Sequence, residues 1–272
     1  MAYLRRKCNT LGDILIGDML CVGPTQVRAE VFQFFKEHFK KVECCRPRIV
    51  DLPLYQILKE EKGMLEEHFS VEEVWSALCV CDGNKELGPD GLKINFIRTN
   101  YEIVKNDFMN FLGEFYRDSS VVKHLNNTFL ALIPKIRNPN SLKDYRPISL
   151  VRVTYKILAK VLANRLKKVM DLVISPNPMA FVKGRQIVDS FVIAEEVIHS
   201  WRKDDLEVIL VKLDFQKAYD SVDHSFFIEV LRLIGFGSKW IEWMRGCISS
   251  AWLSVLVNDS PMKEFLMKKG LR

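Results

Sequence analysis

Hydrophobic and polar positions follow a helical period in the first third of the chain. Over residues 24–41, five apolar side chains recur at a spacing that gathers them on one helical face. They are Val27, Val31, Phe34, Phe35 and Phe39. A second helix is predicted over residues 70–78, because Ser70 and Glu73 form a capping box ahead of an apolar run. The sequence GPDG at residues 88–91 predicts a turn.

The middle of the chain adds strand-like segments to this helical pattern. A helix is predicted over residues 96–118. Residues 127–135 and 146–151 are strand-like, and the loop between them is rich in Asn, Pro and Ser. They predict a hairpin with Lys135 and Arg146 near its two ends.

A long amphipathic helix is predicted over residues 154–173. Its apolar stripe consists of Ile157, Leu158, Val161, Leu162, Leu166 and Val169. Four basic side chains are expected elsewhere on its surface, namely Lys160, Arg165, Lys167 and Lys168. The sequence SPNP at residues 175–178 ends this helix, and another is expected over about residues 188–201.

The stretch EVILVKLDFQKAYDSVDH, residues 207–224, poses the main chemical question. Its apolar side chains, Val208, Ile209, Leu210, Val211 and Leu213, predict a strand buried on both faces, which ends on the carboxylate of Asp214. Burying that charge is costly without a partner. Active sites gather at strand ends in α/β folds, but a hydrolase, a phosphatase or a plain helix cap would give the same pattern. Asp220 is open between an N-cap of the following helix and a ligand.

The last part of the chain again mixes helices and strands. Residues 224–237 predict a helix ended by Gly235 and Gly237, and residues 239–248 predict another. Residues 251–272 predict two strands joined by a turn near residues 258–261.

The charge of the chain is concentrated in one block. The whole sequence has 40 Lys and Arg against 34 Asp and Glu, a net charge of +6. Between Lys123 and Arg185, thirteen basic residues face two acids, which gives +11. The remaining 27 basic and 32 acidic residues therefore give −5. Such a block indicates a surface for a polyanion, with a solvated helix face as the alternative.

The cysteines and the N-terminus suggest an intracellular protein. The seven cysteines are odd in number and follow no zinc-ligand spacing, so we expect reduced structural thiols and no disulfide partner. No apolar window is long enough for a membrane helix. The first residues, MAYLRRKCNT, have no apolar core of a signal peptide. We therefore expect no contact with a membrane, and a location in the nucleus, the cytoplasm or both.

Four segments carry a resemblance to a known family. They are LIPKIRNPNSLKDYRPISL, YKILAKVLANRLKKV, ISPNPMAFVKGRQIVDS and KLDFQKAYDSVDH. In this order they closely resemble the reverse transcriptase of plant non-LTR retrotransposons of the long interspersed element type. The similarity is collinear from about Gly88 to Arg272, and the residues before it resemble, more loosely, the linker that precedes the polymerase in that family.

The resemblance implies an α+β fold, with the fingers and a partial palm of a right-hand polymerase and a helical N-terminal region. Residues 1–85 would form this N-terminal extension, residues 86–205 the fingers, and residues 206–272 the partial palm. The family continues beyond this point with an Ala-Asp-Asp hairpin and a thumb. We therefore expect the chain to be a truncated fragment, and residues 1–272 alone to be inactive in primer extension.

The resemblance also implies roles for residues near the polymerase centre. Asp214 would be catalytic and would bind Mg²⁺, with the backbone carbonyl of Phe215 as a neighbouring ligand, because hard cations take oxygen ligands. Tyr219 falls at the steric-gate position that excludes a ribose 2′-hydroxyl, with a core aromatic side chain as the alternative.

Five further residues fall on finger positions of the family. Lys135 and Arg146 would hold the triphosphate of the incoming nucleotide, a role that suits the bidentate guanidinium. Gly184, Arg185 and Gln186 would lie near the template and the primer, and the alternative is a loop with a helix start.

The function implied is that of an RNA-directed DNA polymerase, which performs nucleotidyl transfer with two metal ions in the full-length protein. Its partners would be an RNA template, a DNA primer and deoxynucleoside triphosphates. The alternative is a catalytically inactive remnant that acts at most as a basic RNA-binding module.

Overall fold

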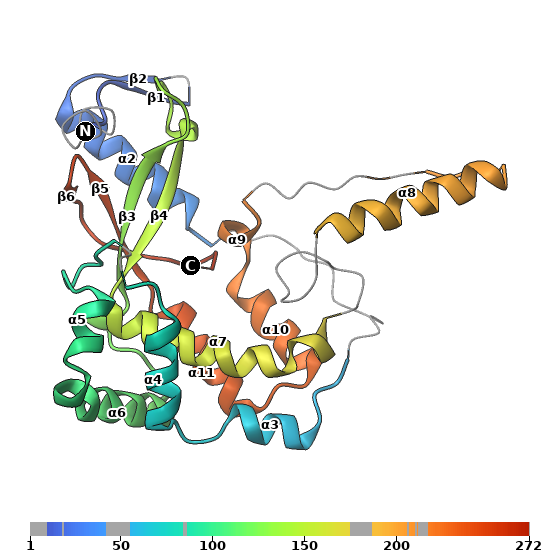
Figure 1. The fold of residues 1–272 in the computed structure, drawn as a ribbon. Coiled ribbons are helices and arrows are strands. Elements are labelled where there is room, and N and C mark those ends of the chain that lie inside the picture. Colours follow the sequence, from blue (N-terminus) through green and yellow to red (C-terminus); the bar gives the residue numbers. More distant parts are fainter. Residues whose placement is uncertain are drawn as a thin grey trace.

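The computed structural model describes residues 10–17, 19–41, 55–83, 86–174, 187–205, 207–209, 211 and 217–271. In these residues a mixed β-sheet and a group of helices build two hydrophobic cores. Figure 1 shows the sheet above the group of helices. This mixture of helices and strands confirms the expected α+β class.

The sheet joins the predicted hairpin to the C-terminal strands. β3 (Asn127–Pro134) pairs antiparallel with β4 (Tyr145–Val151), so the predicted hairpin is confirmed. On its other edge β3 pairs in parallel with β5 (Trp252–Val257). β6 (Ser260–Pro261) and β7 (Phe265–Leu266) pair antiparallel with β5, which confirms the predicted turn between C-terminal strands.

The N-terminal region is not wholly helical, contrary to the prediction. β1 (Ile14–Ile16) and β2 (Met19–Cys21) form a short antiparallel hairpin. Gly17, at the turn, has a φ of 65°, which glycine adopts without steric cost. Strands of three residues are too short to produce a periodic signal, which explains why the sequence did not predict them.

α2 (Pro24–His38) covers the sheet (Figure 1). Its buried Val27, Val31 and Phe35 belong to the same core as Leu130 of β3 and Val255 of β5. The predicted apolar face of this helix is therefore confirmed. The core of the sheet combines segments that are far apart in the sequence.

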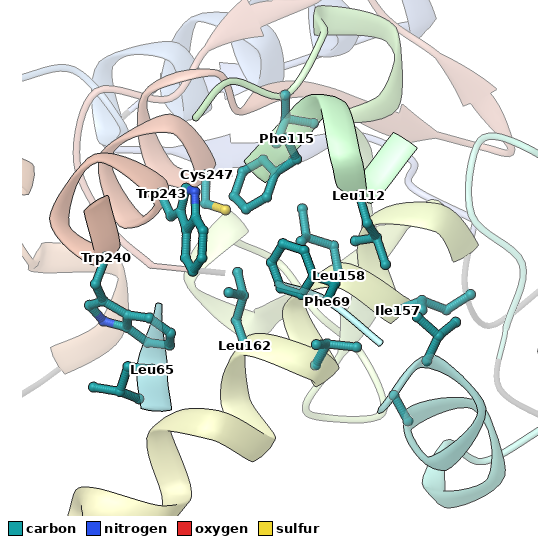
Figure 2. Close-up of a cluster of buried hydrophobic side chains, with 14 of the residues drawn as sticks. Leu65, Phe69, Leu112, Phe115, Ile157, Leu158, Leu162, Trp240, Trp243 and Cys247 are labelled. Atoms are coloured by element: carbon teal, nitrogen blue, oxygen red, sulfur yellow. The ribbon is translucent and has the colours of Figure 1, made fainter. Parts of the chain in front are cut away.

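The second core lies among helices. These are α3 (Lys59–Leu65), α4 (Val71–Val80), α5 (Ile94–Thr99), α6 (Tyr101–Asp118), α7 (Val153–Val173), α10 (His224–Ile234) and α11 (Ser238–Ser249). Figure 2 shows the rings of Phe69, Phe115 and Trp243 in this core. The Trp243 centroid lies 5.3 Å from that of Phe69 and 5.8 Å from that of Phe115. Such aromatic contacts add to the free energy of area burial.

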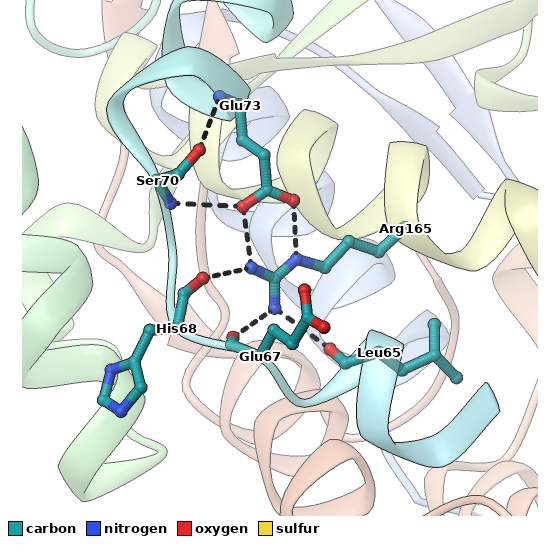
Figure 3. Close-up of polar contacts among 6 residues, drawn as sticks. All are labelled: Leu65, Glu67, His68, Ser70, Glu73 and Arg165. Carbon is teal, nitrogen blue, oxygen red and sulfur yellow. Dashed lines mark hydrogen bonds and ion pairs between the residues drawn. The ribbon is translucent and has the colours of Figure 1, made fainter. Parts of the chain in front are cut away.

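Arg165 of α7 is buried, although its charge predicted a surface position. Its side chain is 3% exposed, and it faces α3 and α4 (Figure 3). Nε and Nη2 donate to the two carboxylate oxygens of Glu73 over 2.8 and 2.7 Å. Nη1 donates to the carbonyls of Leu65 and Glu67, and Nη2 donates also to that of His68. All five guanidinium N–H groups are thus used, which compensates the buried charge.

Glu73 takes part both in the capping box of α4 and in the ion pair with Arg165 of α7. Its carboxylate accepts from the backbone N–H of Ser70 while its own N–H donates to the Ser70 hydroxyl, so the predicted capping box is confirmed. Burial alone would raise the pKa of this carboxyl group, but the hydrogen bonds and the charge of Arg165 hold it below its ordinary value. The start of α4 and the middle of α7 therefore depend on one ion pair.

The predicted strand after residue 207 is wrong for the residues that the structure describes. Glu207, Val208, Ile209 and Val211 belong to no strand, and Ile209 is 91% exposed. A buried strand needs neighbouring strands for its backbone groups as well as apolar side chains. β5 is already paired, with β3 on one edge and β6 and β7 on the other.

Three helices have the expected positions with small differences at their ends. α7 matches the predicted amphipathic helix, and α8 (Ile187–Lys203) matches the predicted helix that precedes the stretch at residue 207. α10 ends at Gly235, with a φ of 84°. Gly237 does not end α10 but stands at the N-cap of α11, because α10 is already complete two residues earlier.

Two absences apply to the described part of the chain. None of its helices has the length and apolarity needed to cross a membrane. Its four cysteines, Cys21, Cys79, Cys81 and Cys247, form no disulfide, and burial raises the pKa of the Cys21 thiol. The division into residues 1–85, 86–205 and 206–272 stays a prediction.

Candidate nucleic-acid interface

The end of the β3–β4 hairpin brings Lys135 and Arg146 together. Arg146 lies opposite Ile133, and the backbone N–H of Lys135 continues the ladder by donating to the carbonyl of Asp144 over 2.7 Å. Side chains two residues apart in a strand point to the same face, so Lys135 and Arg146 share one face of the hairpin end. Both are exposed. The Lys135 ammonium donates to the carbonyl of Lys143 over 2.6 Å.

The loop between these two residues is ordered by local contacts. It contains a single turn, η2 (Leu142–Asp144), and the carboxylate of Asp144 accepts from the backbone N–H groups of Asn140 and Ser141. The N–H of Leu15 in β1 donates to the carbonyl of Asn140 over 2.8 Å. The N-terminal hairpin therefore stabilises the loop by a backbone hydrogen bond.

The buried Tyr145 fixes the start of β4. Its ring belongs to the core of the sheet, and burial, together with the charge of Asp144, raises the pKa of its hydroxyl group. The hydroxyl therefore stays neutral at physiological pH. Tyr145 thus anchors the strand next to the exposed Arg146.

Exposure and side-chain contacts together separate the structural cations of the basic block from the available ones. Arg165 is consumed in the helical core, and Lys123 of η1 (Lys123–Leu125) lies 3.1 Å from Glu264 and 3.8 Å from the centre of the Trp252 ring. Four cations at the end of the β3–β4 hairpin are exposed, namely Lys135, Arg137, Lys143 and Arg146. We call these four the hairpin cations. Exposed cations retain N–H groups for an external anion.

Tyr219 lies in α9 (Ala218–Ser221), a single short turn. Its side chain is 59% exposed, which excludes the core aromatic alternative. Its backbone carbonyl accepts from the N–H of Leu271 over 2.8 Å, and the carbonyl of Val222 accepts from that of Gly270 over 2.6 Å. The last described residues of the chain therefore hold the segment that carries Tyr219.

The N-cap of α10 is Asp223, and the N-cap interpretation of Asp220 is wrong. The Asp223 carboxylate accepts from the backbone N–H of Phe226 over 3.0 Å and from the Ser225 hydroxyl. Asp220 lies inside α9, too far upstream to reach the first turn of α10. One of its carboxylate oxygens lies 3.7 Å from Nε2 of His38.

Five of the predicted site residues lie outside the described residues. They are Asp214, Phe215, Gly184, Arg185 and Gln186. Within the described ranges, no group of three His, Cys, Asp or Glu side chains converges to hold a metal ion. The described residues therefore do not fit a magnesium site by themselves, and we derive no chemical step through a metal.

Two positioning residues were not predicted as such. Asp90, in the confirmed GPDG turn, accepts from the N–H of Val153 over 2.6 Å and so caps the first turn of α7. A Cβ atom at Gly88 would collide with the carbonyl of Val151, so only glycine fits there. The turn itself was readable in the sequence, but its contact with the β4–α7 junction joins residues more than sixty positions apart.

Residues 133–272, about half of the chain, match the family described as "Reverse transcriptase (RNA-dependent DNA polymerase)". The "Transposon TX1 uncharacterized 149 kDa protein" of Xenopus laevis is 29% identical over 253 residues, which cover 92% of this chain and 19% of that protein. A "Retrovirus-related Pol polyprotein from type-2 retrotransposable element R2DM" of Drosophila melanogaster is 22% identical over 216 residues, or 77% of this chain and 20% of that protein. A similar polyprotein from "type-1 retrotransposable element R2" of Popillia japonica is 25% identical over 142 residues, or 52% of this chain and 20% of that protein. The chain thus spans about a fifth of the length of these relatives.

Proposed function

The chain belongs to the reverse transcriptase family, and from this premise we propose that it contributes the fingers and the first part of the palm to an RNA-directed DNA polymerase of a non-LTR retrotransposon. The observation that carries this proposal is the position of the hairpin cations, which lie inside the family match and are exposed at the end of the β3–β4 hairpin. The protein would act inside the cell, on an RNA template and a DNA primer. A plant source stays a prediction.

Lys135 and Arg146 are proposed to bind the triphosphate of the incoming deoxynucleotide. Their shared face and their exposure support this role. A guanidinium group matches phosphate oxygens in a bidentate geometry, and an ammonium group adds a compact charge. The bond from Lys135 to the carbonyl of Lys143 is to a neutral acceptor, so a phosphate would compete for it.

Tyr219 is proposed to select the sugar of the nucleotide. Its exposed ring, on a turn held by backbone hydrogen bonds, supports this role. A ring that is fixed beneath the sugar leaves no room for a 2′-hydroxyl group, whereas deoxyribose fits. Selection would therefore depend on how firmly α9 is held.

Asp214 is proposed to hold Mg²⁺ together with the carbonyl of Phe215, and the segment Gly184–Arg185–Gln186 to contact template and primer. These roles rest on the family and on the donor chemistry, since carboxylate and carbonyl oxygens suit Mg²⁺. A divalent ion bound there would stabilise the charge of the transferred phosphoryl group.

A second candidate function is RNA binding without catalysis. The hairpin cations favour it, because exposed cations bind a phosphate backbone whether or not a metal site is complete. Both candidate functions predict RNA binding, but only the polymerase predicts incorporation of nucleotides.

The product of the full reading frame that contains these residues should extend a DNA primer on an RNA template with Mg²⁺ and deoxynucleotides. Incorporation of labelled deoxynucleotides and RNA binding are measured on the same preparation. Incorporation supports the polymerase. Binding without incorporation would support the RNA-binding alternative instead.

A further inference from the structure

A histidine of the N-terminal helix contacts the turn that carries Tyr219. His38 is the last residue of α2, and its Nε2 atom lies 3.7 Å from a carboxylate oxygen of Asp220, the residue next to Tyr219. Nε2 is buried and forms no hydrogen bond with a described residue. The separation is longer than a hydrogen bond but lies within ion-pair range. Asp220 is therefore the acidic group toward which this buried ring nitrogen is directed.

The imidazole ring of His38 is fixed by aromatic neighbours. It stacks on Phe34 at 6.3 Å with an interplanar angle of 6°, and it meets Phe39 edge-on at 4.9 Å. Phe39 is buried in the core of the sheet, and its carbonyl accepts from the N–H of Lys268 over 2.9 Å. A ring held on two sides in this way keeps its nitrogen directed at α9.

α9 cannot hold its own position. It comprises four residues, whereas isolated helices below about 12 residues are marginal in water. Lys217, which precedes it, has a φ of 51°, a left-handed conformation that a lysine adopts at a cost. External contacts therefore determine where Tyr219 lies. The contacts described so far are the backbone bonds from Gly270 and Leu271 and the side-chain contact from His38.

The approach of the C-terminal residues to α9 is also close. A Cβ atom at Gly270 would lie 2.8 Å from the carbonyl oxygen of Asp220, so only glycine allows this approach. Asp220 is thus held between the backbone of Gly270 and the imidazole of His38. A shift of its carboxylate away from His38 would move α9 and, with it, Tyr219.

We propose that His38 is a positioning residue for Tyr219: by its contact with Asp220 it fixes α9 and so sharpens the discrimination between deoxyribose and ribose. His38 lies outside the residues 133–272 that match the family, so the N-terminal segment takes part in nucleotide selection. The inference rests on the proposed role of Tyr219 as the sugar gate.

The first test measures the position of α9 without using activity. Three variants of the full-length protein are compared with the wild type, namely His38→Phe, Asp220→Asn and their combination. Phenylalanine keeps the ring packing with Phe34 and Phe39 and removes only the nitrogens. Amide hydrogen exchange is followed in peptides that cover residues 217–224 and 266–271. Glu37→Gln, an exposed neighbour on the same turn of α2, is the control.

Both single variants should accelerate amide exchange in these peptides by at least about twofold, which corresponds to the smallest interaction energy expected between residues in contact. The double variant should exchange little faster than either single variant, because both remove the same contact. The control should exchange like the wild type. If His38→Phe leaves exchange in both peptides unchanged, the inference is overturned, whatever Tyr219 does.

The second test measures incorporation of ribonucleotides relative to deoxynucleotides. Tyr219→Ala tests the gate itself, and His38→Phe tests its positioning, with an increase in the ratio of at least about twofold expected for the latter. His38→Gln, which restores an N–H donor, should return part of the discrimination. If Tyr219→Ala raises the incorporation of ribonucleotides relative to deoxynucleotides and His38→Phe does not, the positioning role of His38 is contradicted while the gate remains supported. If Tyr219→Ala leaves this ratio unchanged, the role of Tyr219 as the sugar gate is contradicted, and so is the effect of His38 on sugar selection.

Discussion

Arg165 and Arg146 belong to the same basic block, but the structure gives them opposite surroundings. Arg165 donates all its N–H groups to Glu73 and three backbone carbonyls inside the helical core. Arg146 is exposed on the end of the β3–β4 hairpin, together with the other hairpin cations. The same residue type therefore holds the fold in one region and remains available to an external anion in the other.

A count of charges therefore does not measure a binding surface. A buried cation bonds to other groups of the fold and cannot bind an external anion. Arg165 is buried, so it does not belong to the polyanion surface that the sequence suggested. The two regions should also respond differently to substitution. Changes in the core should reduce stability, and changes at the hairpin should reduce binding.

The largest effect is expected from Arg165→Ala. Three backbone carbonyls and the partly exposed carboxylate of Glu73 would lose the donors of a buried guanidinium group, which costs up to about 3–5 kcal/mol of the free energy of unfolding. Denaturant unfolding of the variant measures this loss. Lys167→Ala, an exposed position on the same helix, should change stability by no more than about 0.5 kcal/mol. Equal losses of stability in the two variants would contradict the structural role of Arg165.

A smaller effect is expected from Asp90→Ala, between the two regions. Asp90 caps α7 directly after β4, and loss of such a cap costs about 1 kcal/mol. Asp90→Asn keeps an acceptor oxygen and should retain most of the stability. If the alanine and asparagine variants unfold at the same denaturant concentration, Asp90 does not act as the cap.

The ion pair of the core should also make stability depend on pH. The pKa of Glu73 is lower in the folded chain than its ordinary value of about 4.3, so this contribution is complete above that pH. It is lost as the pH falls from there through the lower folded pKa. Because Glu73 is partly exposed, solvent reduces the effect. Unfolding followed from about pH 6 to about pH 2 should show a steeper decline in the free energy of unfolding for the wild type than for Glu73→Gln.

At the hairpin, substitution should change binding and leave stability nearly intact. Each phosphate contact on single-stranded RNA contributes about 0.7 to the slope of log K against log salt. Arg137→Ala and Lys143→Ala, at the two hairpin cations without a proposed role in triphosphate binding, should each lower that slope by up to about this amount. Lys93→Ala, an exposed cation on α5's N-cap, should leave the slope as it is. A slope that none of these substitutions changes would place the RNA elsewhere.

Much of this fold could be predicted from local patterns. β3, β4, α7 and α10 follow from apolar periodicity and turn residues, because those signals lie within each element. The burial of Arg165 could not be predicted in this way, since a charge in an amphipathic helix ordinarily faces water and its partners come from residues about one hundred positions earlier.

The candidate site shows the same limit. The sequence predicted a hairpin with Lys135 and Arg146 near its two ends, and the β3–β4 pairing confirms that hairpin. The contact of His38 with Asp220 joins segments from opposite ends of the chain and leaves no local signal. At the described residues 207–209 and 211 the expected strand is absent for a related reason, because an apolar run does not reveal whether neighbouring strands will pair with it.

The most direct test of the central claim is primer extension by the full-length protein with Asp214→Asn. The variant replaces a carboxylate by an amide of the same shape, so the fold should persist while the charge proposed to bind Mg²⁺ is lost. We expect extension on an RNA template to disappear while RNA binding remains. Asp205→Asn, an exposed acid that precedes the same stretch, should extend the primer like the wild type. Full extension by Asp214→Asn would contradict the assignment of this chain to the catalytic centre of a polymerase.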